Sequence, residues 1–422
     1  MSVPFVSLIA LLVAILISCF TPLNIGTLSI GLALVIGWLG DVKVATIVQG
    51  FPANLLLLLG GTTYLFSIAQ TNGTLDKLAH YAIAAVGGKP ALLPVVLFGL
   101  AFALSALGPG QITTSALLAP GAMLIANQVG ISPLLMALVV GNGAQAGAMS
   151  PLAPPGIISA EILAKHGLTG VGGVLWLNMF IVHLAVTVLA YFLFGGLRLW
   201  REGGTLASVE AAPAEALAPF DRKQVATLAG IVALAAGALF LKLDIGLLAF
   251  LIGALLSLFK VVDEKQAIKA MPWNTILMVT GVTVLVNLMS KVGGIDLFAK
   301  LIAQMSTVGT VTLVAGFWSG LVSAYASTTG VILPAFLPMA PNLLKQLGAP
   351  ASDLLPLVSS IIVCGFVVDL SPLSTTGAVF IANAGAKADK NALFRNMLIW
   401  GLSMSVVGAL ASWLAFTVLR LP

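Results

Sequence analysis

Two short runs of hydroxyl and proline residues, one of them beside a carboxylate, are the parts of this chain best suited to chemistry. Asp369 lies two residues before the run Ser371-Pro372-Leu373-Ser374-Thr375-Thr376-Gly377, and a matching run, Ser150-Pro151-Leu152-Ala153-Pro154-Pro155-Gly156, occurs earlier. Proline lacks an amide hydrogen and clashes with the preceding turn, so neither run can continue a regular helix. A broken helix leaves free carbonyls that can ligate a cation and free amides that can hold a carboxylate.

The composition places these runs inside a membrane. Of the 422 residues, 59% are hydrophobic and only 8% are charged, and the mean hydropathy is +1.12. A soluble protein carries about a quarter charged residues. Apolar segments of about 17–25 residues recur along the whole chain, which is the length that a helix needs to cross a bilayer. The sequence therefore predicts an integral membrane protein in contact with the lipid bilayer.

Asp369 is the strongest candidate for holding a cation or a proton. A carboxylate inside a membrane is energetically costly and usually functional. Amide and hydroxyl oxygens can add ligands without a second buried charge, and the candidates of this kind are Asn142, Ser371 and Thr328. A solvated carboxylate with no role in turnover stays open as the alternative for Asp369. For His183, we expect an interhelical hydrogen bond.

Two turn-like sequences inside apolar surroundings extend the predicted site. They are Gly108-Pro109-Gly110-Gln111 and Ser327-Thr328-Thr329-Gly330. Non-helical backbone at membrane depth survives only when it is buried in protein or lines a wet cavity. The predicted substrate-binding residues at these turns and at the two breaks are Gly108, Pro109, Gly110, Gln111, Ser150, Pro151, Ser327, Thr328, Thr329, Ser371, Ser374, Thr375 and Thr376.

Simpler roles compete with these assignments. Single prolines in membrane helices are often plain kinks, although two breaks at equivalent positions, each near a polar turn, argue for a site. Asn142 and Gln145 lie among glycines, so they could face a substrate or belong to a close helix contact. Gln111 and the run Thr113-Thr114-Ser115 could meet a ligand or cap the following helix. Both pairs of readings stay open.

The chain contains an internal sequence repeat, in which the second half resembles the first. Residues 24–79 align with residues 244–299 without a gap, so that Gly26 falls on Gly246 and Gly61 on Gly281. The match resumes at the breaks, where residues 150–156 fall on residues 371–377. Two such halves that meet at interrupted helices usually form a secondary transporter.

We predict an all-α polytopic membrane protein with five spans in each half, each half also holding a re-entrant hairpin and an interrupted helix. An odd number of spans makes the repeats inverted. The first repeat covers residues 1–199, with scaffold spans in 5–71, a hairpin in 90–128 and a broken helix in 132–165. A linker follows at 200–223, and the second repeat covers 224–422, with scaffold spans in 224–290, a hairpin in 308–346 and a broken helix in 353–386.

Loop charges indicate the orientation. If the linker is cytoplasmic, the inner side carries 12 of the 19 Lys and Arg residues, in agreement with the tendency of basic loops to stay inside. Both termini would then be periplasmic, and the same tendency explains the net charge of +5 without a nucleic-acid partner. Cys19 and Cys364 both lie in apolar segments, so no disulfide framework is expected.

The stretch from Gly50-Phe51-Pro52 through Gly61-Thr62-Thr63-Tyr64-Leu65-Phe66 to Asp76 resembles the N-terminal region of MatC-type dicarboxylate carriers. Nearly the whole chain is similar in pattern to the ion transporter superfamily, which includes the divalent-anion/sodium symporters. The resemblance implies a homodimer in which a transport domain moves like an elevator against a scaffold. Those symporters carry Ser-Asn-Thr at both hairpin tips, whereas this chain has Gly108 to Gln111 and Ser327 to Thr329, and the departure leaves the coupling ion open.

The expected function is secondary transport in a bacterial inner membrane. The chain would import a small dicarboxylate anion, of malonate or C4 size, by cation symport. Sodium fits the hydroxyl and carbonyl ligands, whereas protons fit Asp369. No enzyme activity, no metal beyond a sodium ion and no cofactor besides the coupling ion, Na⁺ or H⁺, is expected. The alternatives are the large membrane subunit of a tripartite binding-protein-dependent carboxylate transporter, an intramembrane enzyme and a channel.

Overall fold

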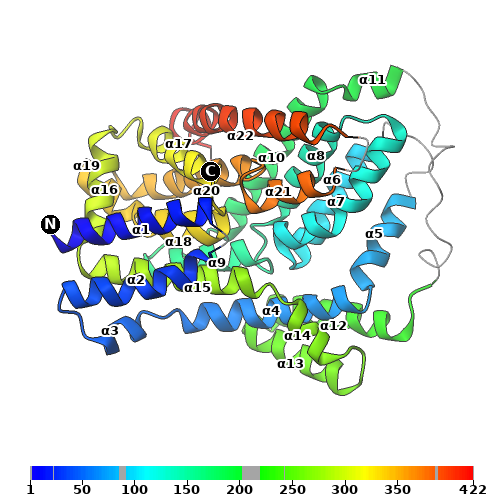
Figure 1. Cartoon of the computed structure of the whole chain (residues 1–422), viewed down its shortest axis with the longest axis horizontal. Helices are drawn as coiled ribbons and strands as arrows, with labels where there is room; N and C mark the ends of the chain where they lie inside the picture. The colour runs from blue at the N-terminus through cyan, green and yellow to red at the C-terminus, as the bar shows by residue number, and fades with distance from the viewer. Residues whose placement is uncertain are drawn as a thin grey trace.

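The structure, a computed structural model, describes residues 2–21, 23–84, 92–201, 219–241, 243–384 and 388–421, and every regular element in these ranges is a helix. The prediction of an all-α chain is confirmed. Most helices run roughly along the long axis of the molecule (Figure 1). In the first half they are α1 (Val3–Phe20), α2 (Ile25–Leu39), α3 (Val44–Gln49), α4 (Ala53–Thr71), α5 (Thr74–Ala84), α6 (Leu93–Leu107), α7 (Gly110–Val129), α8 (Pro133–Gly147), α9 (Pro154–Lys165), α10 (Gly172–Leu193) and α11 (Gly196–Arg201).

The second half follows a similar order. Its elements are α12 (Arg222–Phe240), α13 (Ile245–Leu258), α14 (Glu264–Ala270), α15 (Trp273–Lys291), α16 (Gly294–Gln304), α17 (Val311–Ser323), the π-helical turn η3 (Thr328–Ile332), α18 (Leu333–Phe336), α19 (Ala340–Leu347), the short turn η4 (Ala351–Asp353), α20 (Leu354–Val368), α21 (Thr375–Ala382), α22 (Lys390–Ser412) and the π-helical end η5 (Trp413–Val418).

Several helices have the length and composition to cross a bilayer. Five described stretches of at least 18 residues qualify, and these are Ala53–Thr71, Gly172–Leu193, Trp273–Lys291, Ala351–Val368 and Lys390–Val418. Five shorter apolar helices accompany them, at Val3–Ile17, Ile25–Leu39, Leu93–Leu107, Ile245–Leu258 and Val311–Ser323. Many large apolar side chains on these helices are exposed, among them Trp38, Leu193 and Leu258. Apolar side chains in such numbers on the outside fit a protein whose solvent is lipid.

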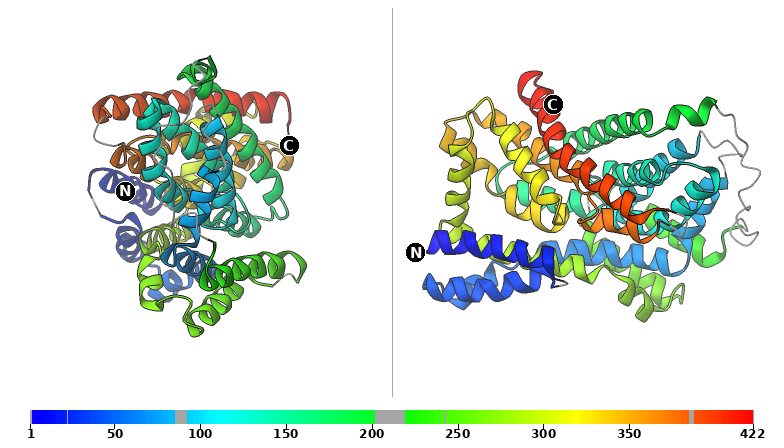
Figure 2. Two further views of the ribbon diagram at one scale, coloured as in Figure 1. Left: turned by 90° about the vertical axis from the view of Figure 1, so that its right-hand side faces the viewer. Right: turned by 45° about the horizontal axis from the view of Figure 1, so that its top comes forward.

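The helices form two packed groups (Figures 1 and 2). In one group, here called the crossing layer, α2 packs against α15 and α4 packs against α13. In the other, here called the broken-helix layer, α8 packs against α6, α7 and α10, while α20 packs against α17 and α22. The layers meet where α4 contacts α9 and where α15 contacts η3 and α18.

Glycines set the two helix crossings of the crossing layer. A Cβ on Gly26 of α2 would lie 2.0 Å from the backbone oxygen of Leu277 in α15, and one on Gly281 of α15 would lie 2.2 Å from the backbone oxygen of Gly26. At the other crossing, a Cβ on Gly61 of α4 would lie 2.0 Å from the backbone oxygen of Gly246 in α13. Main chain therefore touches main chain at both crossings, as small residues permit in membrane helix pairs.

The second hairpin arm differs from its prediction. The sequence predicts a hairpin over residues 308–346, and after α17 the chain forms η3, α18 and α19 in succession instead of one continuous second arm. Pro334, Pro338 and Pro341 lie in this stretch, and each lacks the amide hydrogen that a continuous helix would use. The short helices α3, α11 and α14 were also not expected. They are six or seven residues long, which is too short for hydrophobic periodicity to reveal.

Some boundaries fall partly outside the described residues. Most of the predicted linker at 200–223 lies outside the described residues. Residues 90 and 91 of the first hairpin and residues 385 and 386 of the second broken helix also lie outside them. The end of the linker is helical, since α12 begins at Arg222. There Asp221 accepts a hydrogen bond from the Gln224 amide while the Gln224 side chain accepts one from the Asp221 amide.

The first prediction concerns the crossing of α2 and α15. Gly26→Ala places a methyl group into the backbone of Leu277 and should destabilise the protein by about 1–3 kcal/mol, the usual result of overpacking. Gly31→Ala on the same helix is the matched control, because a Cβ there meets nothing within 4 Å. The measurement is the midpoint of thermal unfolding in detergent. Equal midpoints for the two variants would contradict the assigned role of Gly26.

Candidate functional site

The two helix breaks have the same local geometry. α8 ends at Gly147 and α9 begins at Pro154, and α20 ends at Val368 and α21 begins at Thr375. A Cβ on Gly156 would lie 2.0 Å from the backbone oxygen of Ser150, and one on Gly377 would lie 2.0 Å from that of Ser371. The chain doubles back so closely at each break that only glycine fits. Glycine therefore has a steric reason to occupy the last position of both runs.

Hydroxyl groups satisfy much of the backbone at the breaks. Ser150 Oγ donates to the Ala106 carbonyl at 2.6 Å and accepts from the Leu152 amide at 3.2 Å. Ser374 Oγ donates to the Ser371 carbonyl at 2.8 Å and accepts from the Gly377 amide at 3.2 Å. These bonds matter because an unpaired backbone group away from water costs about as much as a lost hydrogen bond.

Asp369 joins the two halves of the chain. Its Oδ2 accepts hydrogen bonds from Thr376 Oγ1 at 2.9 Å and from Gln145 Nε2 of α8 at 3.3 Å. The backbone of Thr328 also interacts with this carboxyl group. α8 comes close on this side, since a Cβ on its Gly141 would lie 2.3 Å from Leu370 Cδ2. Asp369 is thus held between both broken helices and the tip of the second hairpin, and it is 0% exposed.

Several buried polar atoms of Asp369 and of α8, which contacts it through Gln145, are left without a hydrogen-bond partner in the described part of the chain. Among the described residues, Asp369 Oδ1 and Gln145 Oε1 have no hydrogen-bond partner, and neither polar side-chain atom of Asn142 has one. Asn142 precedes Gln145 by three residues in α8, so the two side chains lie on the same helix face. Buried polar atoms are normally satisfied, and a cluster of unsatisfied ones requires an explanation such as an ion or water. Carboxylate and amide oxygens are suitable ligands for a hard cation.

The two hairpin tips touch each other. Gln111 Nε2, at the start of α7, donates to Thr329 Oγ1 of η3 at 2.8 Å, and both side chains are buried. Ser327 accepts from the Gly330 amide at 3.1 Å, which caps the second tip. Thr328 Oγ1 donates to the Gly365 carbonyl of α20 at 3.0 Å. The second tip is therefore fastened to the broken helix that carries Asp369.

Each tip also packs on the crossing layer. A Cβ on Gly108 would lie 1.7 Å from Phe66 of α4, and one on Gly330 would lie 2.3 Å from Met278 of α15. Gly108 and Gly110 have φ angles of 145° and 72°, which glycine adopts without strain. Both tips are wedged between the layers, so any relative movement of the layers would change their surroundings.

The structure brings together most residues that the sequence nominated. Gly108, Pro109, Gly110, Gln111, Ser150, Ser327, Thr328, Thr329, Ser371, Ser374 and Thr376 are all buried around the tips and breaks. Pro151 and Thr375 are exposed instead. Asp369 and Thr328 lie in one cluster, whereas the Ser371 hydroxyl is directed to its own turn, where it accepts from the Leu373 amide at 3.4 Å.

Two polar residues of the site, Gln145 and Ser323, could not be assigned to it from the sequence. Gln145 bonds Asp369, but its position among glycines gave equal support to a packing role. Ser323 lies within 2.6 Å of the Thr328 hydroxyl and donates to the Gly365 carbonyl at 2.8 Å. It aligns with Ser105 of the first half, and the buried Ser105 hydroxyl has no hydrogen-bond partner among the residues that the structure describes. The alignment of the two repeats, which pairs Ser323 with Ser105, is therefore the sequence feature that could have pointed to Ser323 as a site residue.

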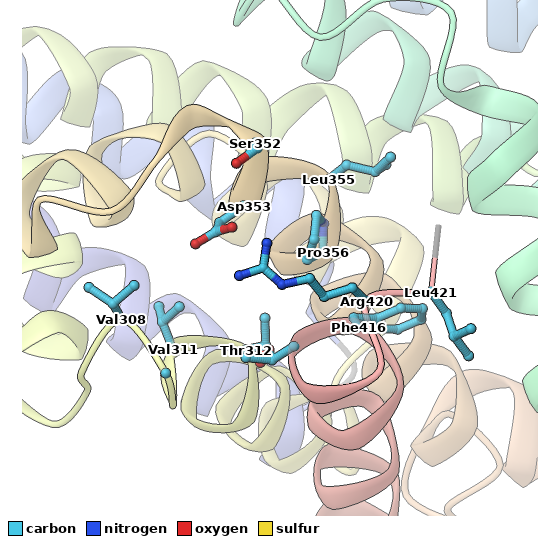
Figure 3. Close-up of a pocket in the computed structure, with 12 residues that line it drawn as sticks. Val308, Val311, Thr312, Ser352, Asp353, Leu355, Pro356, Phe416, Arg420 and Leu421 are labelled. Carbon is cyan, nitrogen blue, oxygen red and sulfur yellow. The ribbon is translucent and has the colours of Figure 1, made fainter.

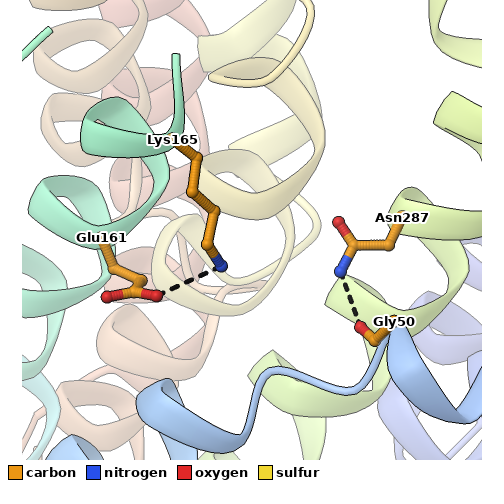
Figure 4. Close-up of polar contacts among 4 residues, drawn as sticks. All are labelled: Gly50, Glu161, Lys165 and Asn287. Carbon is orange, nitrogen blue, oxygen red and sulfur yellow. Dashed lines mark hydrogen bonds and ion pairs between the residues drawn. The ribbon is translucent and has the colours of Figure 1, made fainter. Parts of the chain in front are cut away.

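Charged groups elsewhere do not reach this site. In the described ranges, the one ion pair joins Lys165 to Glu161 at 3.2 Å near the end of α9, and Figure 4 shows it opposite the Asn287–Gly50 hydrogen bond. Partial burial, with a smaller effect of Lys165, lowers the pKa of the adjacent His166. Asp369 consequently has no Lys or Arg partner among the residues that the structure describes.

A separate cavity of about 320 Å³ lies at the opposite end of α20. Figure 3 shows Arg420 reaching into it from the end of the chain toward Asp353, with Thr312 and Phe416 at its wall. A helix of 15 residues is about 22 Å long, so this cavity is well separated from Asp369. Among the described residues, no three His, Cys, Asp or Glu side chains come together as a metal site.

Broken helices, touching hairpin tips and an apolar exterior are together the features of a multi-pass helical membrane protein. Residues 1–148 match the family described as the N-terminus of the dicarboxylate carrier protein MatC. This match covers about a third of the chain, including helices α1 to α4 and the first hairpin.

The chain is similar over a longer range to proteins that are named as transporters. It is 25% identical over 315 residues to the uncharacterized transporters MT2759 and Rv2685 of two Mycobacterium tuberculosis strains, covering 71% of this chain and 70% of each relative. The crystal structure of the Alcanivorax borkumensis YdaH transporter matches with a TM-score of 0.56 at 15% identity and covers 87% of both chains. At that identity the structural match establishes a shared fold alone.

The second prediction concerns the contact between the tips. Gln111→Ala and Thr329→Val each remove the Gln111–Thr329 hydrogen bond, so the double variant should be less than additive, with a coupling energy of about 0.5–1.5 kcal/mol. Unfolding free energies of the two single variants and the double variant give this coupling. Gln111→Ala combined with Ser403→Ala on α22 is the control and should be additive. Additivity in both pairs would mean that the tip contact contributes nothing.

Proposed function

We propose that this protein is a secondary transporter that imports a small dicarboxylate, of malonate or C4 size, together with a cation. The observation that carries the proposal is the buried Asp369 carboxylate, which has no basic partner in the described residues and lies beside unpaired amide oxygens of α8. A buried charge is very costly unless it is paired or coordinates a metal ion. A transported cation would supply the missing charge during each cycle.

Sodium is the preferred coupling ion. The atoms without a donor are Asp369 Oδ1, Gln145 Oε1 and Asn142 Oδ1, all hard oxygen ligands from two interrupted helices. A proton on Asp369 would neutralise the carboxylate and could donate to one amide oxygen, but it would leave the other amide oxygen unpaired. Sodium therefore accounts for more of the unsatisfied atoms. Because the ligands come from both halves of the chain, binding would also hold the halves together.

The substrate is expected at the second break. Pro154 and Pro155 begin α9 and have no amide hydrogens, whereas Thr375 and Thr376 at the start of α21 do. The first amides of a helix have no partner within it, and they favour an anion. A carboxylate would bind at the start of α21, next to the exposed Thr375, and the adjacent cation would reduce the repulsion from Asp369.

The two layers suit a moving and a stationary part. The crossing layer is the scaffold in this proposal, since its helices touch main chain to main chain. The broken-helix layer carries the substrate and moves as an elevator, with the tips sliding along Phe66 and Met278. The remaining parts of the proposal are inverted repeats, a homodimer formed by the scaffold, a cytoplasmic linker and both termini in the periplasm of a bacterial inner membrane. The matched family of dicarboxylate carriers supports the substrate class.

The third prediction tests coupling in proteoliposomes. Uptake of labelled malonate, succinate and citrate is measured while the sodium and proton gradients are varied separately. Uptake of a dicarboxylate should follow the sodium gradient, and Asp369→Asn should reduce it at least roughly tenfold, because a charge-assisted interaction of about 1.5–3 kcal/mol is lost. Asp353→Asn is the matched control, since Asp353 lies at the other end of α20, and it should transport normally.

Three outcomes would overturn parts of the proposal. Absence of dicarboxylate uptake under either gradient would remove the transport function. Uptake that follows the pH gradient in sodium-free buffer would replace sodium with a proton on Asp369. Sodium-driven uptake that is equal in Asp369→Asn and the wild type would take Asp369 out of the cation site.

A further inference from the structure

The last turn of α8, which carries Gln145, is closed by a side chain from α10. Trp176 of α10 donates its indole hydrogen from Nε1 to the backbone carbonyl of Ala146 at 3.1 Å. Ala146 directly follows Gln145, whose side chain bonds Asp369. The indole therefore acts on the end of α8 that reaches the proposed cation site.

The end of α8 has little room to move. A Cβ on Gly147 would lie 2.4 Å from the Phe102 backbone oxygen. A Cβ on Gly143, one turn earlier, would lie 2.5 Å from the Phe98 backbone oxygen, so α8 lies directly against the backbone of α6. The Trp176 ring also stacks on the Phe102 ring, with 6.1 Å between the ring centroids. The backbone of α6 and the indole of α10 together enclose the last turn of α8.

The second half of the chain lacks this indole contact. In the repeat, Ala146 aligns with Val367 of α20. Trp176 aligns with Phe394, which has no N–H group, through the Asn-Met pair that follows two residues later in both halves. Within the described ranges, no hydrogen bond to the Val367 carbonyl is formed. The fold therefore does not require a donor at this position, and the end of α20 next to Asp369 keeps a further open acceptor.

The bond between Gln145 and Asp369 is sensitive to small shifts of α8. Its length is 3.3 Å, and a contact of about 3.6 Å is no longer a hydrogen bond. Without the indole, the carbonyl of the fully buried Ala146 would have no donor, which is unfavourable away from water. The last turn of α8 would then move toward another donor, and a shift of about 0.3 Å would be enough to separate Gln145 from Asp369.

We propose that Trp176 is a positioning residue for the cation. The indole does not touch the cation. It keeps the last turn of α8 closed, so that Gln145 stays on Asp369 and Asn142 stays on the same helix face. This inference rests on the proposed function, because it names a residue that sets the affinity of the proposed sodium site.

Two other hydrogen bonds provide matched controls. Asn178, also on α10, donates to Ser359 Oγ in the first half of α20 at 3.1 Å. Trp413 donates its indole hydrogen to the Gly309 carbonyl at 2.6 Å, and Gly309 lines the cavity at the opposite end of α20 from Asp369. Loss of either bond removes a comparable contact without affecting the last turn of α8.

The test measures equilibrium binding of radioactive sodium to the purified protein. Trp176→Phe keeps an aromatic ring but removes the donor, and it should raise the dissociation constant for sodium about two- to tenfold, the size expected from one net hydrogen bond. Asn178→Ala and Trp413→Phe should bind sodium as the wild type does. In proteoliposomes, the sodium concentration for half-maximal uptake should rise by the same factor in Trp176→Phe, with the maximal rate unchanged.

A double variant separates positioning from a general loss of stability. In a Gln145→Ala background, Trp176→Phe should have no further effect on sodium binding, because the bond that the indole protects is already absent. An equal effect in both backgrounds would overturn the role of Trp176, and so would unchanged sodium binding in the single variant. If Trp176→Phe does not fold, Trp176→Met, which also lacks the donor, is measured in its place. A wild type that binds no sodium would overturn the proposed sodium site itself, and the role of Trp176 with it.

Discussion

Two helices of this protein stop inside an apolar protein layer, and the backbone groups that they leave unpaired have to find partners there. Water cannot satisfy them at membrane depth, where each unpaired group costs several kcal/mol. Much of the surrounding structure supplies those partners. Ser150 and Ser374 bond the turns themselves, and Gly156 and Gly377 let the chain double back. The hairpin tips close over the breaks, and the second tip bonds the Gly365 carbonyl near the end of α20.

The halves satisfy this constraint by different means, and the difference separates the two ligands of the proposed transporter. In the first half, the restarting helix begins with Pro154 and Pro155, which remove amide donors from its start. In the second half, the restarting helix begins with Thr375 and Thr376, which keep theirs, and Asp369 precedes the break. The first half contributes acceptor oxygens through Asn142 and Gln145. The second half contributes both a charge and the amides at the start of α21, so in the proposed transporter this one break would serve two ions of opposite sign.

Much of this arrangement could be predicted because it depends on local chemistry. Prolines fix where α8 and α20 cannot continue, and long apolar segments fix most of the helices. The convergence of Gln111 with Thr329 could be expected from the repeat, but not which atoms would meet, since 218 residues separate them. A hydropathy profile cannot show that Pro334, Pro338 and Pro341 divide the second arm of the second hairpin into separate turns, because the whole stretch is apolar. The pairing of Gln145 with Asp369 depends on how α8 and α20 are rotated, and packing alone sets that rotation.

The glycine crossings have a consequence for how far such a sequence can diverge. Where main chain rests on main chain, the distance between helices is independent of the side chains around the contact. The exposed residues of α2 and α4 can therefore change freely among apolar types while the crossing keeps its geometry. Only Gly26, Gly61, Gly246 and Gly281 are confined, because any added atom would enter the opposing backbone. Two chains can therefore share such a fold at 15% sequence identity, as the similarity to the YdaH transporter illustrates. Very few positions then need to be the same in both sequences.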